Sequence, residues 1–126
     1  ANPIGHLKRW RQNLAKGGKV VMVVPDLHGT KDSVQHRCSI ESIEGEFKRD
    51  VWLPEVHHYS RHLRRDADDT KLIALMERME SIHVHYYDNI NCQMLLDYAV
   101  RELGYADYMI EHTPNHKDFH FVLVNQ

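Results

Sequence analysis

The sequence predicts one mixed α/β domain, and three observations carry that prediction. The continuous run from Val20 to Val24 is typical of a strand buried on both faces in a sheet covered by helices. Apolar residues recur at helical spacing before and after this run. Two alternating segments at the C-terminal end, separated by turn-forming residues, predict an antiparallel strand pair. With 126 residues in all, we expect residues 1–126 to form a single unit.

The first helix and the first strand follow from local signals. Asn2 can cap a helix, and Pro3 suits its first position because the amide that Pro lacks would be unpaired there anyway. The pair Gly17-Gly18 ends this helix, since glycine readily adopts the positive φ of a helix C-terminus. Pro25 then ends the strand, because it has no N–H to donate to a ladder.

A mostly helical insertion is expected at about residues 27–81. Residues 26–39 are polar and aperiodic, which predicts a loop. Helices are predicted at residues 40–51, 55–65 and 71–79. The third is the clearest, and its predicted apolar face consists of Leu72, Ile73, Leu75, Met76 and Met79.

The C-terminal third predicts a long helix and a hairpin. Residues 82–87 alternate and fit either a short strand or an extended loop. Residues 89–103 predict a helix closed by Gly104, and its expected buried stripe is Ile90, Met94, Leu95, Tyr98 and Leu103. Strands at residues 105–112 and 119–124 should form an antiparallel hairpin in which His120 faces outward.

The composition excludes several classes of function. The formal net charge is only -2, with cations and anions interleaved, so no strong field favours nucleic acid or an anionic membrane. The longest apolar run is too short to cross a bilayer, and the polar, basic start does not resemble a secretory leader. Cys38 and Cys92 are too few for a secreted disulfide framework, so we expect free thiols and a cytoplasmic location. Eleven histidines are an unusually high count for this length.

Several motifs together resemble one known family. A Gly17-Gly18 pair precedes the apolar strand, which ends in Pro25-Asp26. The motifs that follow are Thr30-Lys31-Asp32, Arg37, Ser39-Ile40-Glu41, His57-His58-Tyr59, Ile82-His83-Val84-His85 and the ending from Asp118 to Val124. This pattern resembles the C-terminal half of class I S-adenosylmethionine (SAM)-dependent methyltransferases, in a subgroup often encoded near glycosyltransferase and polysaccharide genes. The resemblance implies a partial Rossmann-like fold, with one buried strand and a C-terminal antiparallel strand pair packed by helices.

The resemblance also implies SAM as cofactor, yet the sequence lacks the elements that would hold it. In this family a Gly-rich turn after the first strand approaches the cofactor, and an acidic residue after the second binds the ribose. No such turn follows an apolar strand here. The chain is therefore expected to supply the part that binds a small polar or sugar-like acceptor. Its partner would be a missing N-terminal half or a second copy in a homo-oligomer.

Histidines dominate the candidate site. If residues 82–87 are extended, His83 and His85 point the same way and offer a general base for an acceptor hydroxyl. His57 is a third candidate catalytic residue. Substrate-binding candidates, placed after the strand or within the motifs, are Asp26, His28, Asp32, Arg37, His58 and Tyr59.

Two other functions stay open. His58 and His62 share a helix face at i, i+4, so a divalent metal bound by His58, His62, His83 and His85 is an alternative. A stand-alone oligomerising module is another, because losing the preceding strands would expose a sheet edge beside Val20 to Val24. For every candidate residue the alternative is an ordinary structural or surface role.

Overall fold

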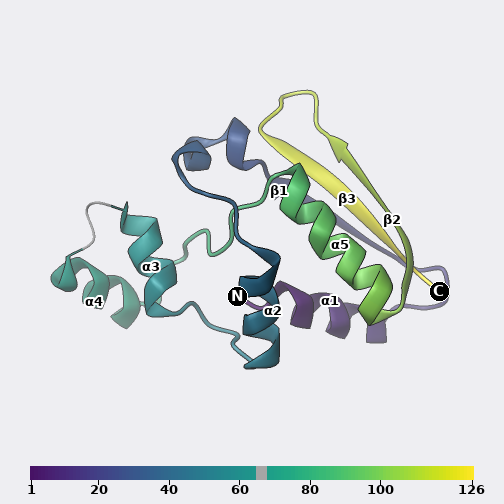
Figure 1. Cartoon of the computed structure of the whole chain (residues 1–126), viewed down its shortest axis with the longest axis horizontal. Coiled ribbons are helices and arrows are strands. Elements are labelled where there is room, and N and C mark those ends of the chain that lie inside the picture. Colours follow the sequence, from purple (N-terminus) through teal and green to yellow (C-terminus); the bar gives the residue numbers. More distant parts are fainter. Residues whose placement is uncertain (65–67) are drawn as a thin grey trace.

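The computed structural model describes residues 1–64 and 68–126. Its elements are α1 (Pro3–Gln12), β1 (Lys19–Pro25), the short 3₁₀ turns η1 (Leu27–Gly29) and η2 (Lys31–Val34), α2 (Ile40–Lys48), α3 (Val56–Leu63), α4 (Asp69–Glu77), α5 (Asn89–Leu103), β2 (Tyr105–His112) and β3 (Asp118–Asn125). The predicted mixed α/β class is confirmed (Figure 1). Residue 65, the predicted end of the helix at residues 55–65, lies outside the described residues.

The sheet has three strands in the order β1-β3-β2, and β3 runs antiparallel to both neighbours. The predicted C-terminal hairpin is therefore confirmed, and its second strand also pairs with β1. Val122 of β3 lies between Val21 of β1 and Met109 of β2, so these three residues form one row across the sheet. Within the described residues β1 is an edge strand, since only β3 pairs along its length.

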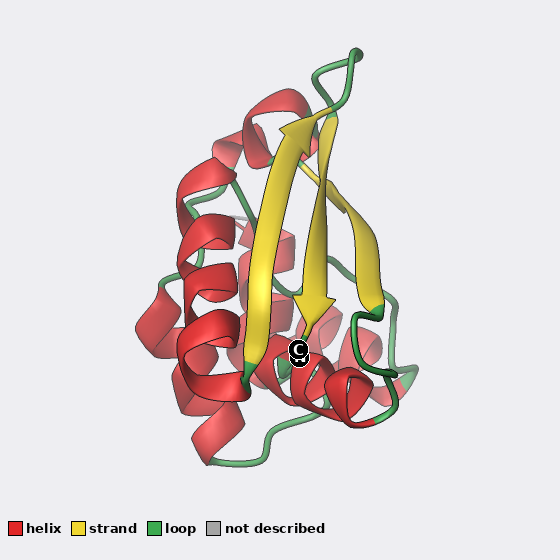
Figure 2. Ribbon diagram, turned by 90° about the vertical axis from the view of Figure 1, so that its right-hand side faces the viewer, coloured by secondary structure: helices red, strands yellow, loops and turns green. Residues whose placement is uncertain are grey.

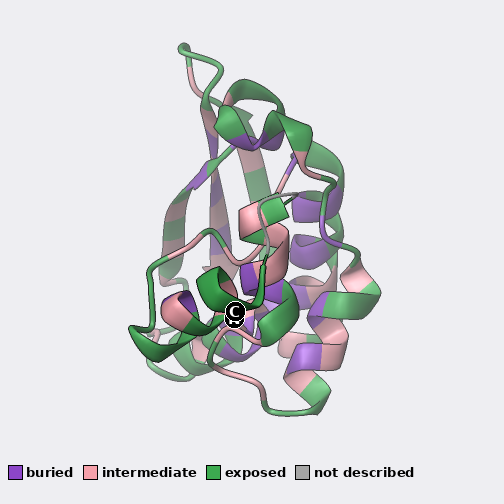
Figure 3. Cartoon of the chain, turned by 90° about the vertical axis from the view of Figure 1, so that its left-hand side faces the viewer, coloured by how far each residue is buried: buried purple, intermediate pink, exposed green. Residues whose placement is uncertain are grey.

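One face of the sheet is covered by helices and the other is bare (Figure 2). On the covered face Val24, Phe119, Phe121 and Leu123 pack against α1 and α5 in the main core. On the opposite face Val21 and Val23 are 65% and 63% exposed. The expectation that β1 is buried on both faces is therefore wrong, because no described helix crosses the second face. Figure 3 shows the resulting alternation of burial along the strands.

The long helix α5 has the predicted bounds but a different buried stripe. Asp88 caps its start by accepting from Ile90 N and Asn91 N, and Gly104 ends it at φ 87°. Its most buried residues are Asn91, Cys92, Leu95, Leu96 and Ala99. Ile90 and Met94, both predicted to be buried, are about half exposed. The prediction failed because the stripe that faces the sheet includes a polar residue, Asn91, which hydropathy assigned to the surface.

The helices α3 and α4 form a pair that stands apart from the sheet (Figure 1). Of the predicted apolar face of α4 only Leu75 is buried, whereas Ile73, Met76 and Met79 are exposed. The physical reason is that, among the described elements, α3 is the one that packs extensively against α4. Among the described residues, no helix has both the length and the apolar character needed to cross a bilayer.

Candidate functional site

Polar side chains converge just beyond the C-terminal end of β1. Residues 82–87 form an extended loop with one isolated parallel bridge, between Tyr87 and Asp26. Leu27 N donates to Tyr87 O at 2.8 Å, which ties this loop to the chain leaving β1. The loop thereby brings His83 and His85 beside the turns η1 and η2.

His83 and Asp32 form a pair at this end of the sheet. Nδ1 of His83 lies 2.5 Å from Oδ2 of Asp32. Asp32 is nearly buried, whereas the side chain of His83 is 50% exposed. A carboxylate that accepts a hydrogen bond from Nδ1 keeps the ring proton on Nδ1. Nε2 is then unprotonated and can accept a proton from another group. The pair therefore presents a basic nitrogen on a half-exposed ring.

His85 belongs to a second, buried group around Glu46. Nε2 of His85 lies 2.7 Å from Oε2 of Glu46, and the backbone N–H of Asn2 donates to the same oxygen at 3.1 Å. The second oxygen, Oε1, lies 2.7 Å from Nε2 of His58. Burial opposes the ionisation of Glu46, but contacts with His58 and His85 outweigh it and hold the pKa of Glu46 far below its usual range. Glu46 is thus a buried carboxylate between two imidazoles.

The hydrogen bonds of His58 define its tautomer. Its Nδ1 accepts from Glu55 N at 2.7 Å, so the ring proton is on Nε2 and faces Glu46. The contact with Glu55 is also half of a capping box that starts α3. His58 is fully buried, and both of its ring nitrogens are already engaged. This geometry gives His58 a structural role in place of the predicted substrate contact.

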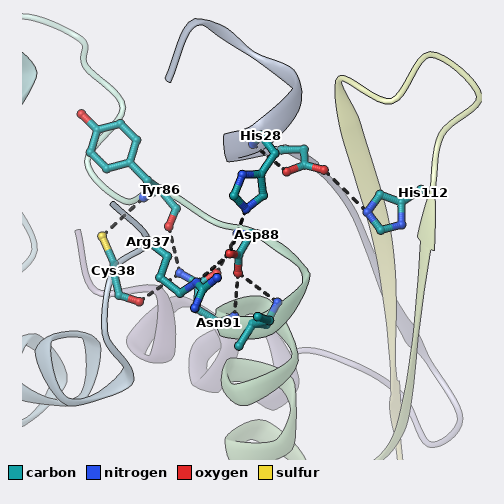
Figure 4. A network of polar contacts seen from close by, with 9 residues as sticks. His28, Arg37, Cys38, Tyr86, Asp88, Asn91 and His112 are labelled. Atoms are coloured by element: carbon teal, nitrogen blue, oxygen red, sulfur yellow. Dashed lines mark hydrogen bonds and ion pairs between the residues drawn. The ribbon is translucent and has the colours of Figure 1, made fainter. Parts of the chain in front are cut away.

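Asp88 organises the remaining predicted residues (Figure 4). Its Oδ2 accepts from Arg37 Nε at 2.6 Å and lies 3.3 Å from Nε2 of His28. Burial disfavours the charged form of Asp88, yet hydrogen bonds from Asn91 N, Arg37 and His28 lower its pKa. Asp26 stands next to this group, because its Oδ1 caps His28 N at 2.9 Å. Asp26, His28 and Arg37 therefore share one network that anchors the start of α5.

Asn91 clamps two distant segments together in the same view (Figure 4). Its Nδ2 donates to the carbonyls of Cys38 and Tyr86 at 3.0 and 2.8 Å, while its Oδ1 accepts from Asp88 N. Cys38 N also donates to Tyr86 O. The buried amide on α5 thus fixes the loop that carries both site histidines.

Two cavities open beside this loop, and His85 and Tyr87 line both. The cavity at the end of β1, of about 240 Å³, has an apolar wall from β1 together with Asp32 and His83. The other, of about 220 Å³, lies between α1, β1 and α5, and its polar lining includes His6 and His85. The first cavity is the one that places a polar pair against space for a small molecule.

The residues that come closest to a metal-binding arrangement differ from the predicted set. Among the described residues, potential ligand atoms of Glu46, Glu55, His57 and His58 lie within 4.8 Å of one another. His58 is the member shared with the prediction, and His62 is exposed on α3. Because Nε2 of His58 carries the proton facing Glu46, a metal would have to displace an existing buried contact.

The structure separates the predicted site residues into groups. Asp32, His83 and His85 line the first cavity. His57 is exposed and stacks against His58, with ring centroids 4.0 Å apart. Tyr59 is buried in α3 and lines neither cavity.

Sequence reasoning missed Glu46, Asp88 and Asn91. A signal for Glu46 was present, since it falls one turn after buried Ile43, on the inward face of α2. Asp88 is similarly recognisable as the residue before a strong helix, with Asn91 at the third helical position. The clamp by Asn91, by contrast, depends on a segment 53 residues away.

The described residues do not fit SAM. None of the three strands is followed by a Gly-rich turn. The glycine nearest the end of β1, Gly29, packs against the β2–β3 turn, where an added Cβ would lie 1.9 Å from His116 O. The absence of a side chain at Gly29 therefore allows the two turns to pack closely together. Comparison with known protein families, with curated proteins and with solved structures gives no match for this chain.

Proposed function

We propose that this chain is the acceptor-binding portion of a SAM-dependent methyltransferase, and that His83 is its general base. The observation that carries the proposal is the Asp32–His83 pair at a cavity beyond the C-terminal end of β1. Ligands of α/β proteins commonly bind beyond the carboxyl ends of strands. The order of β1, α5 and the antiparallel pair β2–β3 along the chain supports the proposal, whereas the exposed face of β1 does not fit the single buried strand that the resemblance implies.

The acceptor's hydroxyl proton would move to Nε2 of His83. Asp32 accepts from Nδ1, keeps that tautomer in place and stabilises the imidazolium formed by the transfer. His85, braced by Glu46, forms the adjoining wall of the cavity, and Tyr86 and Tyr87 offer aromatic surfaces. An apolar and aromatic wall facing a small polar pair suits a sugar-like ring. The methyl donor would be held by a missing N-terminal half or by a second chain.

The test is acceptor binding followed by NMR of the histidine rings. The probes are the methyl glycosides of neutral hexoses and of uronic acids, titrated to about 10 mM, where millimolar affinities are visible. We expect shifts at His83 and His85, with binding weakened in Asp32→Asn. His36→Gln, which changes an exposed histidine, is the matched control. Shifts confined to other regions, or none with any probe, would contradict the proposal.

Calorimetric titration with SAM tests the second half of the proposal. We expect no measurable binding by this chain, because the cofactor would be held elsewhere. Tight binding by the chain alone would overturn that assignment while leaving the acceptor site intact.

A second candidate, an oligomerising module, is favoured by the bare sheet face and the edge of β1. Val21, Val23 and Met109 lie exposed on one face beside an unpaired strand edge, and such edges recruit other strands. Sedimentation should then give a dimer or higher species that Val21→Lys converts to monomer. A monomer at about 100 μM, where micromolar association would be evident, would exclude this candidate.

A further inference from the structure

Cys38 sits in a polar environment that no part of the proposed methyl transfer uses. Its Sγ accepts from Arg61 Nη1 at 3.2 Å and from Tyr86 N at 3.4 Å. The ring of His85, the residue before Tyr86, also favours the thiolate and lowers the pKa of the Cys38 thiol. Two donors, one from α3 and one from the loop at residues 82–87, therefore contact one sulfur, an arrangement that stabilises negative charge on it.

The imidazole beside Cys38 is itself held by a carboxylate. Nε2 of His85 is engaged by Glu46 at 2.7 Å, and the side chain is only 7% exposed. Its other nitrogen, Nδ1, is buried without a hydrogen bond among the described residues. Nδ1 is therefore the ring nitrogen that remains available, either to the Cys38 sulfur or to a small molecule beside it. Thiol, imidazole and carboxylate thus stand in the order seen in nucleophile, base and orienting group.

The second cysteine provides an internal contrast. Cys92 is buried on α5 among apolar residues, and burial followed by repulsion from Asp88 raises its pKa to about 12. At Cys38 burial also opposes ionisation, but contacts with His85, Tyr86 N and Arg61 outweigh it and lower the pKa. Burial alone would lower the pKa of His85. Contacts with Cys38 and Glu46 favour the imidazolium and outweigh burial, so the pKa is raised.

Access to the sulfur limits the size of a reaction partner. Cys38 is 3% exposed, so a bulky reagent cannot reach Sγ without local opening. His85 and Tyr86, which contact the sulfur, are wall residues of the cavity at the end of β1. A reaction partner must therefore be close to the size of water and reach Sγ from that side.

We propose that Cys38 is a peroxide-reactive thiol, activated by Arg61 and His85, and that hydrogen peroxide or a similarly small neutral hydroperoxide is its substrate. The thiolate sulfur attacks one peroxide oxygen, an S–O bond forms and the O–O bond breaks. The leaving hydroxide takes the proton from Nδ1 of His85 and departs as water. Sulfur is oxidised by two electrons to the sulfenic acid and the peroxide is reduced, so thiolate, proton and hydrogen peroxide yield sulfenic acid and water. This reaction does not depend on the acceptor proposed above.

The test is the rate of oxidation at each cysteine of the folded chain, measured by peptide mass spectrometry after brief exposure to hydrogen peroxide. Thiolate is the reactive form, and an ordinary thiol is only a few per cent ionised at neutral pH, so full ionisation raises the rate by up to roughly 30-fold. We expect Cys38 to oxidise at least about 100-fold faster than Cys92, because the raised pKa leaves Cys92 almost entirely protonated.

Substitutions test whether Arg61 is responsible for the reactivity of Cys38. Arg61→Gln should slow oxidation of Cys38 about 10-fold, while Arg101→Gln, which removes an exposed charge on α5, should leave the rate unchanged. A circular dichroism spectrum matching the wild type establishes that Arg61→Gln is folded. If that variant unfolds, Arg61→Lys, which keeps the charge, takes its place and should retain most of the rate. Oxidation of both cysteines at equal rates in the folded wild-type chain would overturn the proposal, as would an unchanged Cys38 rate in Arg61→Gln.

Discussion

His83 and His85 lie two residues apart on one extended loop, and each contacts a carboxylate, yet their surroundings are opposite. His83 meets Asp32 with half of its side chain exposed. His85 meets Glu46 inside the molecule, where His58 and Asn2 N bind the same carboxylate. The comparison teaches that the partner residue does not decide the role of a histidine. Burial does, because a buried charge must be compensated by contacts inside the protein, whereas a half-exposed ring can present a nitrogen to a ligand that enters from solvent.

The largest expected effect comes from removing the buried charge. Glu46→Gln leaves two imidazoles and a backbone N–H around a neutral amide, so we expect the free energy of unfolding to fall by about 3 kcal/mol. Urea denaturation measures this. Glu44→Gln, which breaks only a surface pair with Lys48 on the same helix, should cost about 0.5 kcal/mol or less. Equal losses of unfolding free energy in the two variants would contradict the claim that the buried carboxylate contributes more to stability than the exposed one.

The next effect concerns the clamp that holds the loop of both histidines. Asn91→Leu removes the donor to the carbonyls of Cys38 and Tyr86, so we expect a loss of about 2 kcal/mol in stability. The exposed neighbour Asn89, changed to Ala, is the control and should alter stability little. Hydrogen exchange at Tyr86 should quicken in Asn91→Leu alone. Protection there equal to that of the wild type would show that the loop is held by other contacts.

A smaller effect appears in the pH dependence of stability. The pKa of Glu46 is lowered by folding, so its contribution is present above its ordinary value of 4.5 and is lost as the pH falls below it. The pKa of His85 is raised, so its contribution is complete below 6.5 and is lost as the pH rises through the folded value. The stability difference between wild type and Glu46→Gln should therefore be greatest between pH 4.5 and 6.5 and shrink on both sides. Denaturation midpoints across this range measure it, and a difference independent of pH would contradict the buried ion pair.

The smallest stability effect is expected at the exposed histidine. Asp32→Asn should change the free energy of unfolding by less than about 1 kcal/mol, because His83 is half solvated. The tautomer is the informative measurement, since the proton on Nδ1 loses its acceptor. Nitrogen NMR of the His83 ring should show mainly protonated Nδ1 in the wild type and a mixture in the variant. The same tautomer in both would mean that Asp32 does not orient the ring.

How much the sequence predicts depends on whether a feature is local. The bounds of α5 and of the hairpin follow from apolar periodicity after residue 89, a glycine at 104 and alternation in β3, all of which are local in sequence. The bare face of the sheet was not predictable, because the Val20 to Val24 run has the same composition whether one face or two are covered. Glu46 was missed because a carboxylate is normally assigned to solvent, and its partners come from α3, the extended loop and the N-terminus.

The close packing of Gly29 against the β2–β3 turn has a consequence for how the sequence can vary. Any side chain there would meet the carbonyl oxygen of His116, and that oxygen belongs to backbone that cannot rotate away. Asp26 N also donates to Lys117 O at 2.9 Å, so the same turn supports the residue that follows β1. In a saturation mutagenesis library selected for folding, position 29 should accept glycine alone, and changes in length at residues 113–117 should be tolerated only where this contact survives.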